Sequence, residues 1–225
     1  MPELDIDGII SEIYKDTHEL WNEYKKYMGP AQHFGFKILY GPATLEPSVF
    51  IVGLQPGGDD LHATDDERMG PPSHNEYLSQ SWILANVLRR RLGIKYLERS
   101  VGANVNFFRA PNWEFWTKKV SPLARDRLES FSLYQLRRLI SVLKPTQILI
   151  LGWEAMFQLV GGSFEELLAD KMTSSGRRRL LKAGSFEGIP AFAIPHPSSA
   201  WRNPPVTDSQ WEAIAEKLGA ARGHA

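Results

Sequence analysis

Four short segments rich in apolar residues are separated by longer stretches in which apolar residues recur at helical spacing. Short apolar segments bounded by turn residues are typical of buried parallel strands, so residues 49–52, 101–108, 148–151 and 189–194 are predicted to be strands. Strands that alternate with helices favour an α/β fold, in which helices cover both faces of a mainly parallel sheet. No internal repeat or linker interrupts this pattern, and we therefore expect a single domain over residues 1–225.

Helical periodicity predicts helices over residues 7–28, 78–92 and 132–143. The first of these is amphipathic and ends at Gly29-Pro30, and we expect residues 1–30 to be an N-terminal helical addition that packs on the sheet. Three capping boxes, in which a hydroxyl precedes a Glu or Gln by three residues, predict further helix starts. They are Ser132 with Gln135, Ser163 with Glu166, and Thr207 with Gln210.

Composition narrows the class of protein. With 225 residues, 43% of them hydrophobic and 23% charged, the chain is typical of a globular protein with one full core. Its apolar runs are too short to cross a bilayer and its N-terminus lacks the features of a signal peptide, so we expect no membrane partner and a cytoplasmic location. The absence of cysteine excludes disulfides, thiol catalysis and thiolate-held zinc or iron–sulfur clusters.

Two loops that follow predicted strands carry the residues best suited to chemistry. Residues 53–58, Gly-Leu-Gln-Pro-Gly-Gly, follow the first strand, and residues 194–203, Ile-Pro-His-Pro-Ser-Ser-Ala-Trp-Arg-Asn, follow the last. The carboxyl ends of parallel strands meet at one edge of a sheet, where open α/β folds bind ligands. Each loop also has a purely structural interpretation, because Gln55 can cap a Gly-Pro turn and His196 can shape a turn between two prolines.

Together the two loops resemble motifs of the uracil-DNA glycosylase superfamily. The first motif of that family takes forms such as GQDPYH, GINPG, GMNPG or GEAPG and the last begins HPS; here residues 53–57 read GLQPG and residues 196–198 read HPS. Residues 104–111 look like the family's TNVVKCRP, with Asn106 at the asparagine that reads the base. The resemblance spans residues 48–216. Iron–sulfur members place a cysteine where Ala110 stands, so this chain resembles a cluster-free relative.

The resemblance implies a three-layer α/β sandwich whose central, mainly parallel, four-stranded sheet is flanked by helices. It also implies a monomeric, monofunctional DNA glycosylase that needs no metal or organic cofactor. Such an enzyme flips uracil or a related damaged base out of DNA and hydrolyses its N-glycosidic bond in base excision repair. His196 would donate to the leaving base, Gln55 would place the attacking water, and Asn106 would select the base.

Further residues near these motifs are expected to complete the site. The residues expected to bind the base are Gly53, Pro56, Gly57, Ser73, Tyr77 and Phe107. Ser73 stands where the family has an aromatic ring that stacks on the base, and His74, Tyr77 or Phe107 would supply the ring instead. The residues expected to contact DNA follow the HPS core: Ser198, Ser199, Trp201 and Arg202. Two alternatives stay open, since Asn106 could merely close a strand end and Trp201 could be part of the core.

Charge gives a weaker indication of a nucleic-acid partner. The formal net charge is zero, so affinity for DNA would require a local basic patch. The basic runs at residues 89–91, 118–119 and 177–179 are candidates, although such runs are usually solvated. The polar residues 59–75 include carboxylates and His62, but their spacing fits no established metal-ligand pattern, and we expect a solvated loop at the mouth of the pocket.

Two other functions are compatible with these residues. The first is a nucleic-acid or nucleotide-binding protein on the same fold with altered or lost catalysis, which Gln55, Ser73 and the neutral charge favour. The second is an enzyme that acts on a free nucleoside or another small molecule. Salt would discriminate between them, because affinity for DNA falls steeply with ionic strength and affinity for an uncharged nucleoside does not.

Overall fold

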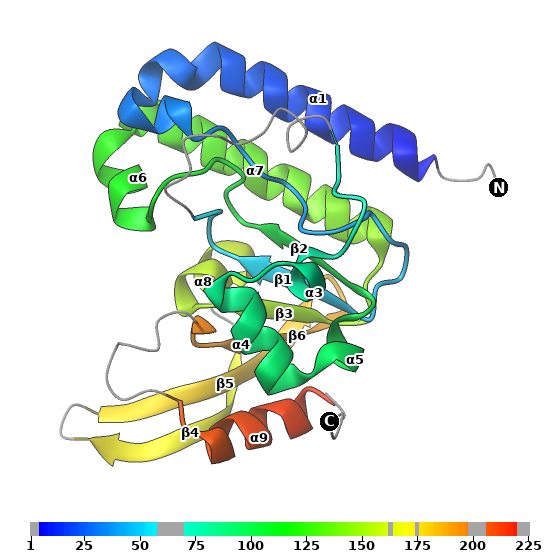
Figure 1. Ribbon diagram of the computed structural model, residues 1–225. Helices are drawn as coiled ribbons and strands as arrows, with labels where there is room; N and C mark the ends of the chain where they lie inside the picture. Colours follow the sequence, from blue (N-terminus) through cyan, green and yellow to red (C-terminus); the bar gives the residue numbers. More distant parts are fainter. Residues whose placement is uncertain (1–4, 58–69, 162–163, 174–175, 198–205, 220–225) are drawn as a thin grey trace.

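A six-stranded sheet forms the centre of the molecule in the computed structural model, which describes residues 5–57, 70–161, 164–173, 176–197 and 206–219 (Figure 1). The strand order is β2-β1-β3-β6-β5-β4. The strands are β1 (Val49–Gly53), β2 (Ser100–Asn104), β3 (Ile148–Leu151), β4 (Glu165–Thr173), β5 (Gly176–Phe186) and β6 (Ile189–Ile194).

Four neighbouring strands, β2, β1, β3 and β6, are parallel. Every residue of β1, β2 and β3 is buried, as expected for parallel strands covered on both faces. The strand predictions at residues 49–52, 148–151 and 189–194 are thus confirmed. The strand predicted at residues 101–108 is shorter and runs from Ser100 to Asn104.

The expectation of a four-stranded sheet is wrong, because β5 adds antiparallel to β6 and β4 adds antiparallel to β5. The helix start predicted from Ser163 and Glu166 is also wrong, since residues 165–173 form β4; Ser163 itself lies outside the described residues. A capping box is a local signal of four residues, and here strand pairing over Glu165–Thr173 outweighs it.

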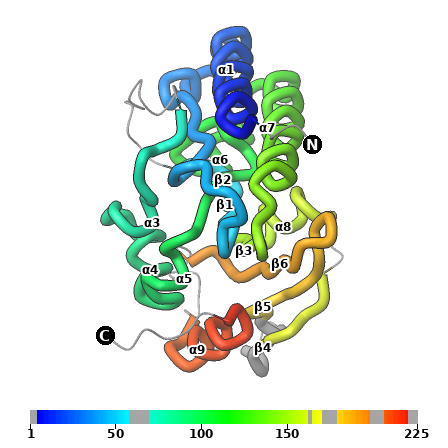
Figure 2. Tube along the Cα trace, turned by 90° about the vertical axis from the view of Figure 1, so that its right-hand side faces the viewer, coloured from blue at the N-terminus to red at the C-terminus, as the bar shows by residue number. Residues whose placement is uncertain are grey.

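Helices cover both faces of the sheet, which confirms the layered α/β architecture (Figure 2). Side chains of alternate strand residues point to opposite faces of the sheet. Phe50 and Val52 face one helical layer, and Val49 and Ile51 face the other. The first layer contains α1 (Ile6–Tyr24), α6 (Trp113–Lys119), α7 (Pro122–Leu143) and α8 (Trp153–Val160). The second contains α3 (Glu76–Ser79), α4 (Ile83–Leu92), α5 (Ile94–Leu97) and α9 (Asp208–Lys217).

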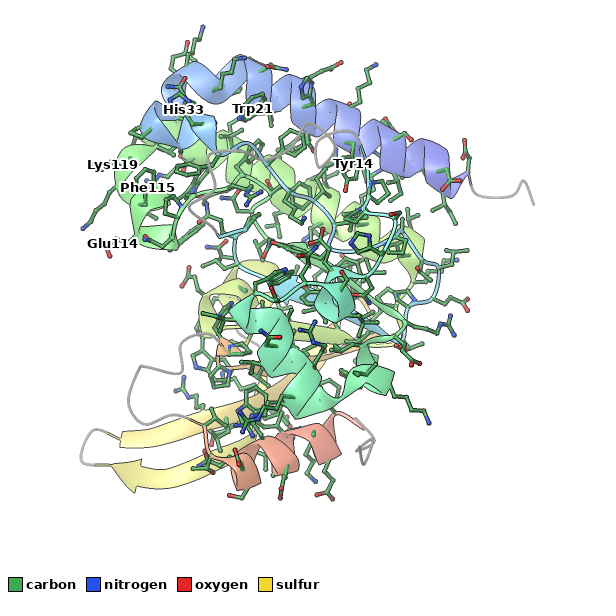
Figure 3. The ribbon with its side chains drawn as sticks, viewed as in Figure 1. Tyr14, Trp21, His33, Glu114, Phe115 and Lys119 are labelled. Atoms are coloured by element: carbon green, nitrogen blue, oxygen red, sulfur yellow. The ribbon has the colours of Figure 1, made fainter. Side chains whose placement is uncertain are left out.

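The N-terminal helix is present but shorter than predicted. It ends at Tyr24, and two 3-10 turns, η1 (Lys25–Tyr27) and η2 (Gly29–His33), follow it. The buried face of α1 packs against α7 rather than directly on the sheet, which corrects the expectation (Figure 1), and Arg138 of α7 pairs with Glu12. At the other end of this layer, Figure 3 shows Phe115 and Lys119 of α6 near His33 of η2. Within the described part of the chain, no helix is long and apolar enough to span a membrane.

Two other helix predictions need correction. The helix expected over residues 78–92 is divided into α3 and α4, and Arg89 donates to the carbonyls of Tyr77, Leu78 and Gln80 at the end of α3. The helix expected from Ser132 begins at Pro122, with Ser121 as its N-cap. The capping box of Thr207 with Gln210 is confirmed at the start of α9.

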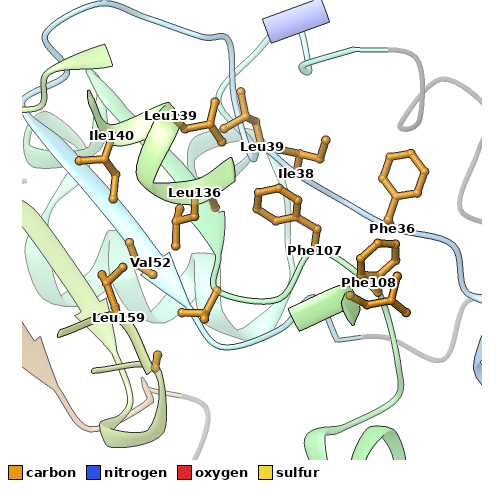
Figure 4. Packing of buried hydrophobic residues seen from close by; sticks show 14 of the residues in the cluster. Phe36, Ile38, Leu39, Val52, Phe107, Phe108, Leu136, Leu139, Ile140 and Leu159 are labelled. Carbon is orange, nitrogen blue, oxygen red and sulfur yellow. The ribbon is translucent and has the colours of Figure 1, made fainter. Parts of the chain in front are cut away.

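Ser132 is not a cap but a fully buried link between α7 and the chain that follows β2. Its hydroxyl donates to the Leu128 carbonyl (2.8 Å) and accepts from the Phe107 amide (3.2 Å). Leu136 and Leu139 of α7 lie beside Phe107 in the same core region (Figure 4).

Replacing Ser132 with Ala is therefore expected to destabilise the protein. The buried Phe107 amide would lose its partner, at a cost of about 1–3 kcal/mol. Urea unfolding measures this loss, and Ser130→Ala, an exposed position on the same helix, is the matched control. Equal unfolding free energies for the two variants would contradict the assignment.

Candidate functional site

The three residues predicted to carry the chemistry all follow the carboxyl ends of parallel strands. Gln55 lies two residues after the end of β1, Asn106 two residues after β2, and His196 two residues after β6. β1 and β2 are neighbours, whereas β3 separates β1 from β6. Since adjacent strands are about 4.8 Å apart, the β1 and β6 strand ends are separated by roughly 10 Å. The topology thus brings all three residues to one edge of the sheet.

The loop after β1 is held against the loop after β2 by continued pairing. The amides of Val105 and Asn106 donate to the carbonyls of Gly53 and Leu54, both at 2.9 Å. The Ala110 amide donates to the Pro56 carbonyl at 3.4 Å. Residues 53–57, the first predicted motif, therefore form a turn that backbone hydrogen bonds hold along its length. Gly57, at the end of this turn, is exposed.

Both carboxamides of the site hydrogen-bond to the backbone of Phe108. Gln55 Nε2 donates to the Phe108 carbonyl (2.9 Å), and the Phe108 amide donates to Asn106 Oδ1 (3.2 Å). These bonds fix which end of each side chain is available. Gln55 Oε1 and Asn106 Nδ2 remain, and both are buried without a hydrogen-bond partner. One acceptor and one donor are thus left for a ligand or a water, and each costs about 1–3 kcal/mol if it stays unmet.

The backbone at Phe108 is itself held by a bridge to Phe36. On the bridged side the Lys37 amide donates to the Phe107 carbonyl (2.8 Å), and the Arg109 amide donates to the Gly35 carbonyl (3.0 Å). The Phe108 ring stacks on Trp116 of α6, with an interplanar angle of 9°. In this extended geometry the N–H and C=O of Phe108 point away from the bridge, toward the two carboxamides.

Asn104, the last residue of β2, is a site residue that the sequence analysis did not single out. It is paired with Gly53, and a Cβ at Gly53 would overlap Asn104 Oδ1. Its Nδ2 donates to the Tyr40 hydroxyl at 2.8 Å, which fixes the orientation of the amide. Glycine at the end of a buried strand was the available signal, because it indicates a close approach by a neighbouring group.

Aromatic residues form a cluster on the outer side of β2. The rings of Tyr40, Tyr77 and Trp82 lie 5.6–5.7 Å apart between centroids. Tyr77 is 2% exposed and lies against Gly102 of β2. Burial raises the pKa of Tyr77 well above its usual value, so its hydroxyl is neutral at physiological pH.

The candidates for a ring that stacks on the base occupy different surroundings. Phe107 is completely buried in the core beside α7, and Tyr77 is buried in the aromatic cluster. Ser73 and His74 are exposed and lie within 3.4 Å of each other through Ser73 Oγ and His74 Nδ1. Of the three predicted rings, only His74 is on the surface.

A buried ion pair adjoins Tyr40 of this cluster. Lys37 Nζ lies 2.8 Å from Glu76 Oε1 and 5.1 Å from the centroid of the Tyr40 ring. Burial raises the pKa of Tyr40, and the positive charge of Lys37 opposes that rise. The ion pair links the segment before β1 to α3. It thereby helps to hold Tyr40, whose hydroxyl accepts the hydrogen bond from Asn104.

His196 lies beside Gly152, which follows β3. Gly152 has a φ of +99°, a backbone conformation that favours glycine, and a Cβ there would lie 3.5 Å from His196 Cβ. Burial lowers the pKa of His196 from its usual value of 6.5. At neutral pH the imidazole is therefore uncharged, with one ring nitrogen able to donate and the other able to accept.

Several predicted residues cannot be placed. Ser198, Ser199, Trp201 and Arg202 lie outside the described residues, as do residues 58–69 of the polar stretch. Among the residues that are described, no group of three or more His, Asp or Glu side chains could hold a metal ion. A groove of about 350 Å³ lies elsewhere, near Arg137, Phe157 and the β5–β6 turn.

No known family model matches the chain, and no curated protein matches it either. The resemblance to glycosylases consequently rests on the sequence motifs at residues 53–57, 104–111 and 196–198.

Close packing at Gly53 gives a direct test of the site geometry. Gly53→Ala is expected to displace Asn104 and to destabilise the protein by about 1–3 kcal/mol. Gly57→Ala is the matched control, because nothing lies within 4 Å of a Cβ at that position. Thermal or urea unfolding compares them. Equal stability of the two variants would contradict the close approach of Asn104.

Proposed function

We propose that this protein is a DNA glycosylase that takes a flipped uracil or a related damaged base into the carboxyl edge of the sheet and hydrolyses its N-glycosidic bond. One observation carries the proposal. Phe108 orients Gln55 and Asn106 so that one buried acceptor and one buried donor remain, on the same sheet edge as His196.

The remaining donor and acceptor suit one edge of uracil. That edge has a carbonyl oxygen next to a ring N–H, so it can accept from Asn106 Nδ2 and donate to Gln55 Oε1. Hypoxanthine and xanthine have the same arrangement, whereas cytosine and adenine present an amino group beside a ring acceptor. Buried polar groups discriminate strongly because a mismatched base leaves them unpaired.

His196 suits the leaving-group step. As the glycosidic bond breaks, negative charge gathers on the carbonyl oxygens of the departing base. A neutral imidazole N–H can donate to such an oxygen, and burial strengthens the interaction because little water screens it. In this pose Gln55 Nε2 is bound to Phe108 and Gln55 Oε1 accepts the ring N–H of the base, so another group of the site has to hold the attacking water.

The test is release of the base under single-turnover conditions, with uracil in single-stranded, U·G and U·A oligonucleotides and with hypoxanthine, xanthine and cytosine alongside. We expect His196→Ala to slow release by about 10²–10³-fold, the usual cost of losing one donor to a developing charge. His33→Ala, an exposed histidine of η2, is the control. A rate unchanged by His196→Ala would refute the leaving-group role.

Activity should also depend on pH through His196. Because burial lowers the pKa of His196, the active neutral form persists below pH 6.5, and the rate should fall only as pH drops through that lowered pKa. The free energy of unfolding should change in the same direction. The folded protein binds the His196 proton less tightly than the unfolded chain does, so stability is lost as pH falls. A rate that rises on acidification would instead indicate an imidazolium donor.

A second candidate is a binding protein with this pocket but without hydrolysis. Two observations favour it: a carboxamide at Gln55 is no general base, and two of the three candidate stacking rings are buried. Base-specific binding of uracil-containing DNA without any abasic product would establish it.

A further inference from the structure

A fourth residue stands in the row of strand ends that carries Gln55, Asn106 and His196. Each of those residues lies two positions after its strand, and Trp153 lies two positions after Leu151, the end of β3. β3 pairs with β1 on one side and with β6 on the other. The end of β3 is therefore about 4.8 Å from each of the strand ends that carry Gln55 and His196.

The backbone around Gly152 fixes where Trp153 enters this edge of the sheet. The Gly152 amide donates to the Ile194 carbonyl at 2.8 Å, so the pairing of β3 with β6 continues past Leu151. Gly152 then turns with a φ of +99°, and Trp153 begins α8 directly after it. Side chains of a helix lean toward its N-terminus, so the indole of this first residue leans past the start of α8, toward the row of strand ends.

The indole of Trp153 is held by the core and still reaches the surface. Trp153 is half-buried, and it packs against the buried core of the layer that contains α7 and α8. Leu54, the neighbour of Gln55, packs against the same core from the end of β1. A ring that is held in this way can stack on a ligand with little further loss of conformational entropy.

The aromatic residues on the β2 side of the site cannot serve in the same way. Phe107 and Phe108 are completely buried, and Tyr77 is 2% exposed, so a base could reach these rings only if the core opened. A flipped base is read by hydrogen bonds to its edge together with stacking between aromatic or apolar side chains. Trp153 combines partial exposure with a position at a strand end, beside the hydrogen-bonding group of Gln55.

We propose that Trp153 is the residue on which the flipped base stacks, and that it meets the base from the β3 side, between Gln55 and His196. This inference rests on the proposed function and places the stacking ring outside the two motif loops. Indole offers a large rigid apolar face, and every nucleobase has a π face to match it. The structural alternative is that Trp153 only covers the core at the start of α8, and its loss would then weaken the binding of every ligand alike.

The experiment compares two duplexes that differ in the presence of one base. One duplex carries a deoxyuridine fluorinated on its sugar, so that its glycosidic bond resists hydrolysis, and the other carries a tetrahydrofuran residue without a base at that position. Fluorescence anisotropy gives the affinity of each protein for both duplexes. We expect Trp153→Ala to lower the ratio of uracil-duplex affinity to base-free-duplex affinity by about 5–150-fold, the usual cost of removing one stacking ring. An unchanged ratio would overturn the inference.

Trp113→Ala is the matched control. Trp113 is also half-buried, also begins a helix and packs against the same core, but it lies well beyond the end of β2. Its replacement is expected to change both affinities by the same factor and to leave their ratio intact. An equal fall of the ratio in the two variants would indicate a general loosening of this layer and would overturn the stacking role.

Trp153→Phe keeps a ring and separates stacking from folding. It is expected to retain most of the affinity ratio and to lose the fluorescence change that stacking on an indole produces. Binding of the uracil duplex should quench the tryptophan emission of the unmodified protein more than that of Trp153→Phe, and equal quenching would overturn the inference even if Trp153→Ala did not fold. Failure of the proposed function looks different, because the unmodified protein would release no base. Base release together with an affinity ratio that ignores Trp153 would overturn the stacking role alone.

Discussion

The candidate site depends on the backbone of one residue, Phe108. Its N–H and C=O meet two carboxamides from different loops, while the peptide groups on either side of it pair with the segment around Phe36. The backbone of this one residue therefore decides that Asn106 presents a donor and Gln55 an acceptor. Without that constraint, either amide could rotate to offer the opposite group, and the proposed base pocket would not distinguish a uracil-like edge from a cytosine-like one.

The sheet supplies the second constraint. Parallel pairing of β2, β1, β3 and β6 aligns four strand ends, and the residues just beyond them become neighbours although they are far apart in the sequence. The antiparallel hairpin of β4 and β5 continues the same sheet beyond that row. One hydrogen-bonded sheet thereby brings together the residues of the proposed base pocket.

The sequence predicted the parallel strands well, because residues 49–52 and 148–151 are continuous apolar runs, and such runs are typical of strands buried on both faces. It predicted the β4–β5 region wrongly: the pattern of Ser163 and Glu166 is local, and the pairing that makes a strand there is not. It also placed Gln55, Asn106 and His196 at strand ends. It could not show that Phe107 is in the core, that Asn104 lies over Gly53, or that Phe108 orients both amides, because each depends on contacts between distant segments.

The most direct measurement is a titration of free uracil, and separately cytosine, into uniformly ¹⁵N-labelled protein, followed through the side-chain amide signals of Asn106 and Gln55. The account predicts that uracil moves the Asn106 Nδ2 protons downfield as they acquire an acceptor, and that cytosine leaves them unchanged. Identical responses to the two bases, or no response to either, would contradict a pocket built to hold a carbonyl beside a ring N–H.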